Sequence, residues 1–211
     1  MTFNTPYITS LFLMVIISGC GDDLNLQVKS EVPTPLASQL PLDLGIYYND
    51  NFKNFVFKED SESRGLWTID NRASRLALFN EILPSMFKTV NPVENVTVMD
   101  PLLDIILEPE VMEMQVALPQ ETQSDMFEAW IKYVIKMYKP GGELITQWQI
   151  TGYGKTHTAM FKNKERGLNT AINMALRDLG AKMVLDFPRA PGVKNWLAST
   201  IDCAQYSYLC Q

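Results

Sequence analysis

Five carboxylates stand close together in the middle of the chain, and their type and spacing could support chemistry. They are Asp100, Asp104, Glu108, Glu110 and Glu113. Such a group could bind a cation, or supply the two carboxylates that glycosidase-type catalysis places on either side of its substrate. In an extended strand, Glu108 and Glu110 would share one face. No second catalytic cluster or aromatic cleft is marked beside them, so a solvated strand face is the simpler interpretation.

The run Gly152-Tyr153-Gly154-Lys155-Thr156 ends like a phosphate-binding P-loop. That loop needs a first glycine five positions before Gly154, where this chain has Gln149. We therefore expect no nucleotide site here. The glycines indicate a bend or bulge at the end of a strand instead.

His157 is the only histidine of the chain, and it lies in a polar stretch. No motif marks a nucleophile or an orienting acid that would complete a catalytic group with it. A zinc site normally takes several Cys and His ligands, which this chain does not offer in one cluster. We predict an exposed loop histidine, no metal, no cofactor and no enzymatic activity.

Cys20 follows an apolar run at residues 8–17 and the small pair Ser18-Gly19. The run is too short to cross a bilayer, for which a helix needs about 20 apolar residues. Its layout is that of the apolar core and cleavage region of a secretory signal. The alternative is an ordinary buried amino-terminal helix that contains a cysteine.

The residues Ile17-Ser18-Gly19-Cys20 also resemble the bacterial lipobox. This resemblance implies that residues 1–19 are a signal peptide, that cleavage occurs before Cys20, and that its thiol carries a diacylglycerol. Gly21 rather than Asp follows the cysteine. The resemblance therefore implies an outer-membrane protein, anchored by lipid and facing the periplasm.

Cys203 and Cys210 are the two cysteines that remain once Cys20 is assigned to lipid. In an oxidising periplasm we expect them to form a disulfide that closes a short carboxy-terminal loop at residues 201–211. The alternatives are intermolecular pairing and a free dithiol.

The formal net charge is −6, and 46% of the residues are hydrophobic. The negative balance argues against a nucleic-acid partner, which would select basic patches. The apolar fraction is enough for a real core. We expect a polar, proline-punctuated tether at residues 20–41 and a single domain at residues 42–200.

Residues 126–138 carry the clearest strand pattern, because apolar residues occupy every second position. Pro140-Gly141-Gly142 predicts a hairpin turn into a partner strand at residues 143–154. Further strands are expected at residues 42–48, 96–99 and 105–118, with an extended piece around Phe52 to Phe57. Apolar residues three and four apart predict helices at about 70–90 and 164–184, and a short helix at 191–199.

Four aromatic residues of the predicted hairpin, together with Tyr133, could form a patch on the open sheet face: Trp130, Tyr138, Trp148 and Tyr153. Core packing and cross-strand pairing would explain several of them. A patch too large for a monomer would mark a surface for a protein partner or a lipid tail.

The element order predicts an α+β two-layer sandwich, with a mostly antiparallel sheet of about five strands and two long helices on one face. An exported lipoprotein with this layout resembles the envelope lipoproteins related to the TolB amino-terminal domain, to LptE and to YajG. The resemblance implies a non-catalytic accessory or assembly part of an envelope complex, which docks to a protein partner. The alternative is a protein that binds a lipid or another amphiphile.

Overall fold

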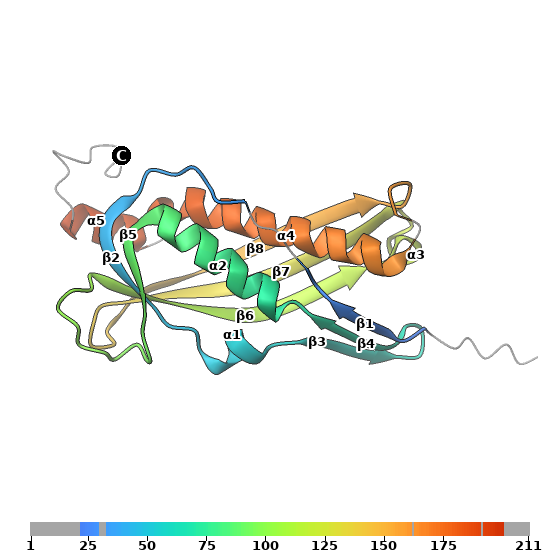
Figure 1. Cartoon of the computed structure of the whole chain (residues 1–211), viewed down its shortest axis with the longest axis horizontal. Coiled ribbons are helices and arrows are strands. Elements are labelled where there is room, and N and C mark those ends of the chain that lie inside the picture. Colours follow the sequence, from blue (N-terminus) through green and yellow to red (C-terminus); the bar gives the residue numbers. More distant parts are fainter. Residues whose placement is uncertain (1–21, 30–32, 162, 191, 201–211) are drawn as a thin grey trace, which may run out of the picture.

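The computed structural model describes residues 22–29, 33–161, 163–190 and 192–200 (Figure 1). Three long strands form its main ladder: β6 Ile105–Ala117, β7 Met126–Tyr138 and β8 Leu144–His157. The β6–β7 and β7–β8 pairs are both antiparallel. At the β7–β8 turn, Gly141 and Gly142 have φ values of 95° and 91°, which only glycine adopts without steric cost. The predicted hairpin is thus present.

The main sheet has five strands in the order β5-β2-β6-β7-β8. Strand β2, Leu40–Ile46, pairs in parallel with β6 on one side and with β5, Phe87–Pro92, on the other. The α+β class and the five-stranded sheet are confirmed. The sheet is mixed rather than mostly antiparallel, because β2 reaches both neighbours by long connections.

A second sheet of three strands was not expected from the sequence. It contains β1 Leu24–Gln27, β4 Gly65–Asp70 and β3 Phe57–Ser61, in that order. Strand β1 lies within the predicted tether, yet Leu24, Leu26 and Val28 are buried. The prediction of a free tether up to residue 41 is therefore wrong for these residues, because their apolar side chains join the core.

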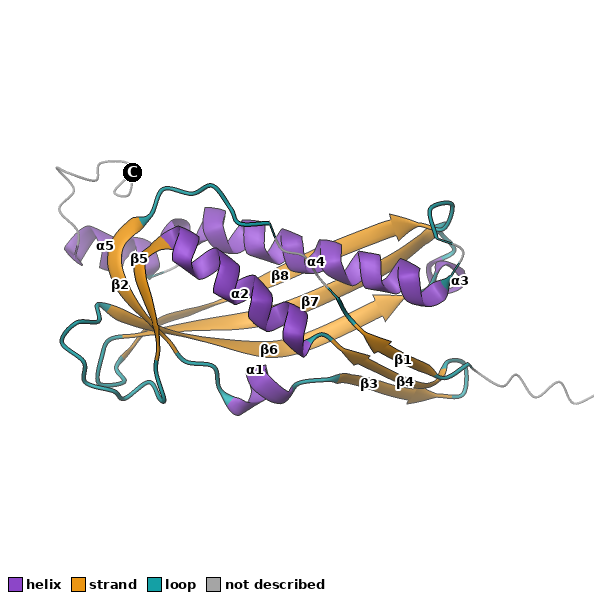
Figure 2. Ribbon diagram, viewed as in Figure 1, coloured by secondary structure: helices purple, strands orange, loops and turns teal. Residues whose placement is uncertain are grey.

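Helices α2, Arg72–Met86, and α4, Lys164–Asp186, lie over the main sheet on the same side (Figure 2). Helix α4 begins after Asn163, whose side chain accepts from the backbone N–H of Arg166. The short elements are α1 Asp50–Asn54, α3 Pro119–Thr122, a 3-10 turn at Phe187–Arg189 and α5 Val193–Thr200.

The core fills the space between this helix layer and the sheet. Side chains from β1 through α5 belong to one continuous cluster. Its largest rings pack edge to face, with Phe52 and Phe79 centroids 5.2 Å apart at 90°. Within the described part of the chain, no helix has both the length and the apolar character that a membrane span requires.

Three local predictions are wrong. The helix expected up to residue 90 ends at Met86, and Phe87 begins β5 because it pairs with β2. Phe52 lies in the short helix α1, whose N-cap Asn49 accepts from the Phe52 N–H over 2.7 Å. Residues 96–99 form a turn and loop instead of a strand. In the first two cases, a short apolar run fits both a helix and a strand.

Candidate functional site

The main sheet presents its two faces differently. Inward residues of β7, such as Ile131 and Tyr133, are fully buried beneath the helices. The residues between them, such as Trp130 and Lys132, remain half-buried. The face opposite the helices therefore holds the accessible side chains of β6, β7 and β8, and we call it the open face.

Polar side chains on the open face are paired across the strands. Lys132 Nζ donates to Glu113 Oε2 over 3.1 Å, and Lys136 Nζ donates to Glu110 Oε2 over 2.7 Å. The ion pair with Lys132 holds the pKa of Glu113 below its usual value. Glu110 and Glu113, two of the five carboxylates, are therefore paired with lysines of the neighbouring strand.

Trp130 and Tyr153 lie opposite each other on β7 and β8, with ring centroids 5.2 Å apart. The Tyr153 hydroxyl donates to Glu128 Oε2 over 2.8 Å. Burial, and then this hydrogen bond, raise the pKa of Tyr153. The two rings thus pack against each other across the β7–β8 ladder, with Glu128 of β7 fixing the Tyr153 hydroxyl, and we call them the aromatic pair.

A shallow hollow of about 180 Å³ lies beside the aromatic pair. It is lined by Glu113, Gln115, Trp130, Lys132 and Thr151. An aromatic ring, an amide, a hydroxyl and an ion pair therefore meet at one place on the open face. Only the register of three strands brings them together, so the sequence alone did not identify this group.

Glu108 occupies the other end of the same face and is 8% exposed. Its two oxygens accept from Asn49 Nδ2 and from the Tyr138 hydroxyl, each over 2.8 Å. Burial and the contact with Glu108 raise the pKa of Tyr138. Tyr138 is eight residues from Trp130 along β7, about 27 Å in an extended strand, so it is not part of the aromatic pair.

Trp148 was expected on the open face, and this placement is wrong. It pairs with Ile135 in the β7–β8 register and is 9% exposed on the helix side. Its ring meets Phe187 edge on, with centroids 5.8 Å apart. The expected patch of four aromatic residues is therefore divided between two faces and two ends of the sheet.

Asp100 and Asp104 lie outside the open-face group. Asp100 Oδ1 accepts from the Leu102 N–H, and Asp104 Oδ2 accepts from the Asp43 N–H over 2.8 Å. The Asp100 contact is local to the loop before β6, whereas the Asp104 contact joins the end of this loop to β2. The structure does not gather the five carboxylates into one site.

The Gly152–Thr156 run is a regular part of β8 rather than a loop. A Cβ atom on Gly152 would lie 2.1 Å from the Ala175 carbonyl oxygen of α4. The glycines therefore allow the helix to approach the strand, and the expected bend or bulge is absent from this register.

His157 lies at the exposed end of β8, where its Nδ1 accepts from the Ala159 N–H over 2.9 Å. This contact closes the turn after the strand. Among the described residues, no three His, Cys, Asp or Glu side chains are placed to hold a metal ion.

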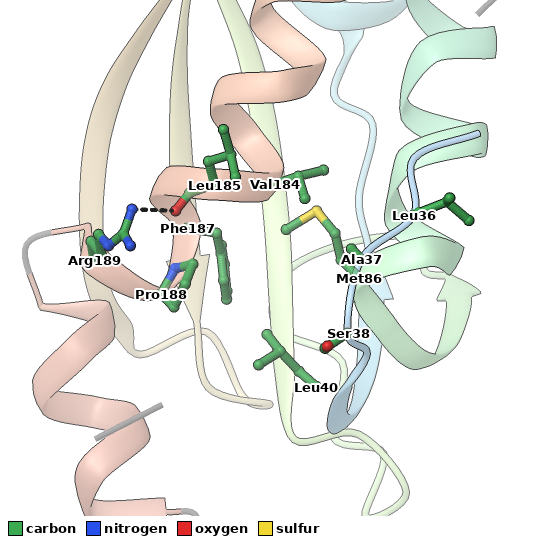
Figure 3. Close-up of a pocket in the computed structure, with 10 residues that line it drawn as sticks. All are labelled: Leu36, Ala37, Ser38, Leu40, Met86, Val184, Leu185, Phe187, Pro188 and Arg189. Atoms are coloured by element: carbon green, nitrogen blue, oxygen red, sulfur yellow. Dashed lines mark hydrogen bonds between the residues drawn. The ribbon is translucent and has the colours of Figure 1, made fainter. Parts of the chain in front are cut away.

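A pocket of about 410 Å³ lies between the carboxy-terminal ends of α2 and α4 and the segment before β2 (Figure 3). Its apolar lining includes Leu40, Met86, Val184 and Phe187. Arg189 stands at one side, and its Nη1 donates to the Leu185 carbonyl. Sequence patterns did not predict this pocket, because its walls come from segments far apart in the chain.

Arg75 was also missed, because the helix expected at about residues 70–90 was predicted from its apolar residues alone. Leu76 is exposed and Arg75 is fully buried. Its Nη1 donates to Asn71 Oδ1 over 2.7 Å, and its Nη2 to the Phe52 carbonyl over 2.6 Å. Burial lowers the pKa of Arg75. It braces α1 against α2 as a structural group.

The proposed lipid attachment site at Cys20 and the proposed disulfide between Cys203 and Cys210 lie outside the described residues. Both stay predictions from the sequence.

No protein-family model and no curated protein matches this chain. Three solved bacterial structures show a distant similarity. Protein XCC0632 from Xanthomonas campestris, assigned to family model DUF330, is 11% identical, with 77% of this chain and 91% of that chain covered and a TM-score of 0.48. A homologue of neuraminyllactose-binding hemagglutinin from Helicobacter pylori is 12% identical, with coverages of 83% and 100% and a TM-score of 0.46.

The hypothetical protein CT253 from Chlamydia trachomatis is 8% identical, with 69% of this chain and 94% of that chain covered and a TM-score of 0.40. None of the three is named as a relative of TolB, LptE or YajG. At these identities and TM-scores, the similarities assign neither a family nor a function to this chain.

Proposed function

We propose that this protein is a non-catalytic, lipid-anchored component of the bacterial cell envelope that docks to a protein partner through its open face. The lipobox-like residues before Cys20 support the anchor, and Gly21 supports an outer-membrane position facing the periplasm. Envelope lipoproteins of the TolB, LptE and YajG type provide the analogy for an assembly role.

The aromatic pair is the observation that carries the docking proposal. Trp and Tyr are the residues that most often dominate protein interfaces, and they act best when fixed before binding. Trp130 and Tyr153 are half-buried, in ring contact at a tilt of 32°, and held by the hydrogen bond of Tyr153 to Glu128. Around them, the Lys–Glu pairs supply a polar rim of the kind that surrounds such anchors.

The open-face carboxylates are already paired with side chains of this protein, which supports a binding role over a catalytic one. A general acid or base must exchange its proton with substrate, whereas Glu110 and Glu113 are each held in an ion pair. Glu108 already accepts from two side chains.

A photo-crosslinking experiment tests the docking proposal in cells. A benzophenone amino acid at Gln115, beside the aromatic pair, should yield a discrete crosslinked product that disappears with Trp130→Ala. The same amino acid at Met174, an exposed residue on α4, serves as the matched control and should not form that product. Equal products from both sites, or a product unaffected by Trp130→Ala, would contradict docking through the open face.

The anchor has its own test. Cells given radiolabelled fatty acid should label the wild-type protein, and Cys20→Ser should abolish the label and leave an unprocessed precursor. Equal labelling of the two proteins would reject the lipobox interpretation.

The 410 Å³ pocket favours a second function, the binding of an amphiphile. Its volume falls within the range of small-molecule sites, about 300 to 1,000 Å³. The apolar walls fit a hydrocarbon chain, and Arg189 is placed to meet an anionic head. A fluorescent fatty acid should bind the purified domain and lose affinity in Ser38→Trp, which fills the pocket, but not in Met174→Trp. Equal affinity in both variants would exclude this site.

A further inference from the structure

The beginning of the described chain is fastened to the domain rather than free. Asp23 Oδ1 accepts from the Leu66 N–H over 2.8 Å, and the Asp22 carbonyl accepts from Trp67 Nε1 over 3.2 Å. Lys164 Nζ donates to the same carbonyl over 3.4 Å. Strand β4 and the start of α4 therefore fix the point where the chain enters the domain.

This entry point lies at one end of the long axis of the molecule (Figure 1). The same end contains the β3–β4 turn, α3 and the connection from β8 to α4. We call it the near end. The β7–β8 turn and α5 lie at the opposite end, the far end.

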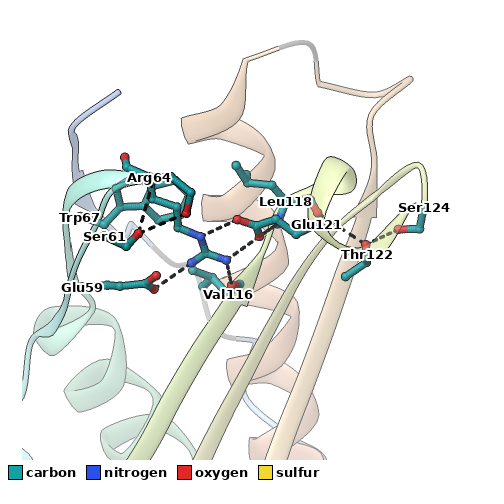
Figure 4. Close-up of polar contacts among 10 residues, drawn as sticks. Glu59, Ser61, Arg64, Trp67, Val116, Leu118, Glu121, Thr122 and Ser124 are labelled. Carbon is teal, nitrogen blue, oxygen red and sulfur yellow. Dashed lines mark hydrogen bonds and ion pairs between the residues drawn. The ribbon is translucent and has the colours of Figure 1, made fainter. Parts of the chain in front are cut away.

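The near end is rigid, because Arg64 ties its parts together (Figure 4). The guanidinium forms ion pairs with Glu59 on β3 and with Glu121 on α3. Its Nη2 also donates to the Val116 carbonyl of β6 over 3.0 Å. The single positive charge of Arg64 offsets one of these two carboxylate charges.

Two exposed apolar side chains mark the near end. Leu66, at the start of β4, is 50% exposed, and Met160, in the turn after β8, is 68% exposed. Lys164 at the start of α4 belongs to the same end, with its ammonium 5.2 Å from the centroid of the Trp67 ring, next to Leu66 in sequence. Apolar tips with a neighbouring cation suit the headgroup layer of a membrane.

The length of chain between Cys20 and Asp22 restricts the position of this end. Two residues span at most about 7 Å, even when fully extended. A lipid on Cys20 would therefore hold Asp22, and the groups bound to it, within the headgroup region. The tether expected from the sequence at residues 20–41 would have imposed no such restriction.

We infer that the near end, with Leu66, Met160 and Lys164, lies against the phospholipid headgroups of the membrane that holds the Cys20 lipid. This inference rests on the proposed lipid anchor. Strand β7 has 13 residues, so its ends are about 40 Å apart. The far end, including the 410 Å³ pocket beside the last turn of α4, is thereby directed away from the membrane.

Fluorescence quenching tests this orientation in the full-length lipoprotein, purified from cells and reconstituted into phosphatidylethanolamine–phosphatidylglycerol vesicles. A single label is placed at Met160→Cys or at Met99→Cys, in a Cys203→Ser, Cys210→Ser background. Met99 is a matched control because it is 84% exposed in a far-end loop, where the Gly141 N–H donates to the Val98 carbonyl. Headgroup spin-labelled lipids should quench the label at position 160 several-fold more than the label at position 99.

A spacer variant separates this inference from the anchor itself. A Gly/Ser insertion of about 16 residues between Gly21 and Asp22 averages about 22 Å and should reduce quenching at position 160 to the level at position 99. Equal quenching at both positions in a fatty-acid-labelled protein would overturn the orientation and leave the anchor intact. Absence of the fatty-acid label would instead overturn the proposed anchor.

Discussion

Gly154 of β8 lies directly beneath Ala171 of α4, so close that a Cβ atom on the glycine would be 2.1 Å from the Ala171 carbonyl oxygen. Gly152 stands in the same relation to Ala175, one turn further along the helix. Two glycines at alternate positions of one strand thus let 23-residue α4 rest on the backbone of the sheet. This packing accounts for the run that looks like the end of a P-loop.

We expect Gly154→Ala to destabilise the protein by about 3 kcal/mol or more, because backbone atoms of α4 cannot move aside as a flexible side chain can. Gly180→Ala is the control. There a Cβ atom would lie 2.9 Å from the tip of the Leu78 side chain, and alanine improves the helix by about 1 kcal/mol. Urea unfolding measures both. Similar losses in the two variants would show that close backbone packing is not the cause.

Arg75→Met should cost about 3 kcal/mol. The apolar side chain fits the site, but the Phe52 carbonyl and Asn71 Oδ1 lose their buried donors, each worth about 1 to 3 kcal/mol. Arg72→Met removes a half-exposed arginine of the same helix and should cost clearly less, because solvent screens its ion pair with Asp70. Thermal unfolding should rank the two variants in this order. A larger loss for Arg72→Met would contradict the bracing role of Arg75.

Asp70 should make the free energy of unfolding depend on pH. Its hydrogen bond with Arg72 lowers its pKa from 3.8 to about 2. A carboxyl with a depressed folded-state pKa stabilises the protein above pH 4 and loses that contribution as the pH falls toward 2. Arg72 is half exposed to solvent, so we expect about 1 kcal/mol.

Asp70→Asn should therefore be less stable than wild type at pH 7, with the difference vanishing near pH 2. Asp60→Asn, which removes an exposed carboxylate on β3, is the comparison. Urea unfolding across this pH range gives the result. A difference that persists unchanged at pH 2 would mean that the Arg72 contact does not depress the pKa of Asp70.

Substitution of the two hairpin tryptophans should have different effects. Loss of Trp148 should mainly reduce stability, and loss of Trp130 should mainly abolish docking. Trp148→Ala empties a buried site against Phe187 and should cost about 3 to 5 kcal/mol. Trp130→Ala on the open face should cost about 1 kcal/mol and abolish docking. Denaturant unfolding and the Gln115 crosslink report the two effects. Loss of stability in Trp130→Ala as large as in Trp148→Ala would place both rings in the core.

We predict a disulfide between Cys203 and Cys210 that contributes little to global stability, because the loop it closes is short and terminal. Without reductant, thiol titration of residues 21–211 should detect no free thiol, and a non-reducing gel should show a monomer. Two reactive thiols, or a dimer that reductant dissolves, would reject this pairing.

The sequence by itself determined the elements that carry a long and unambiguous period. Strand β7 was expected at residues 126–138 and is found there, with the predicted inward side chains buried. Helix α4 begins at Lys164, where the pattern placed it. In both segments more than a dozen residues repeat one period, so local sterics and burial favour the same structure.

Tertiary structure alone decided the short elements and the site. Strand β1 exists because four residues find β4 in a distant part of the chain, and β5 forms because Phe87 pairs with β2. Whether the side chains of Trp148 and Arg75 lie on the buried or the exposed side of their elements depends on which neighbours exclude water from them. The hollow beside Trp130 and Tyr153 needs the register of three strands. A short apolar run is compatible with several conformations, and only long-range pairing and packing select one of them.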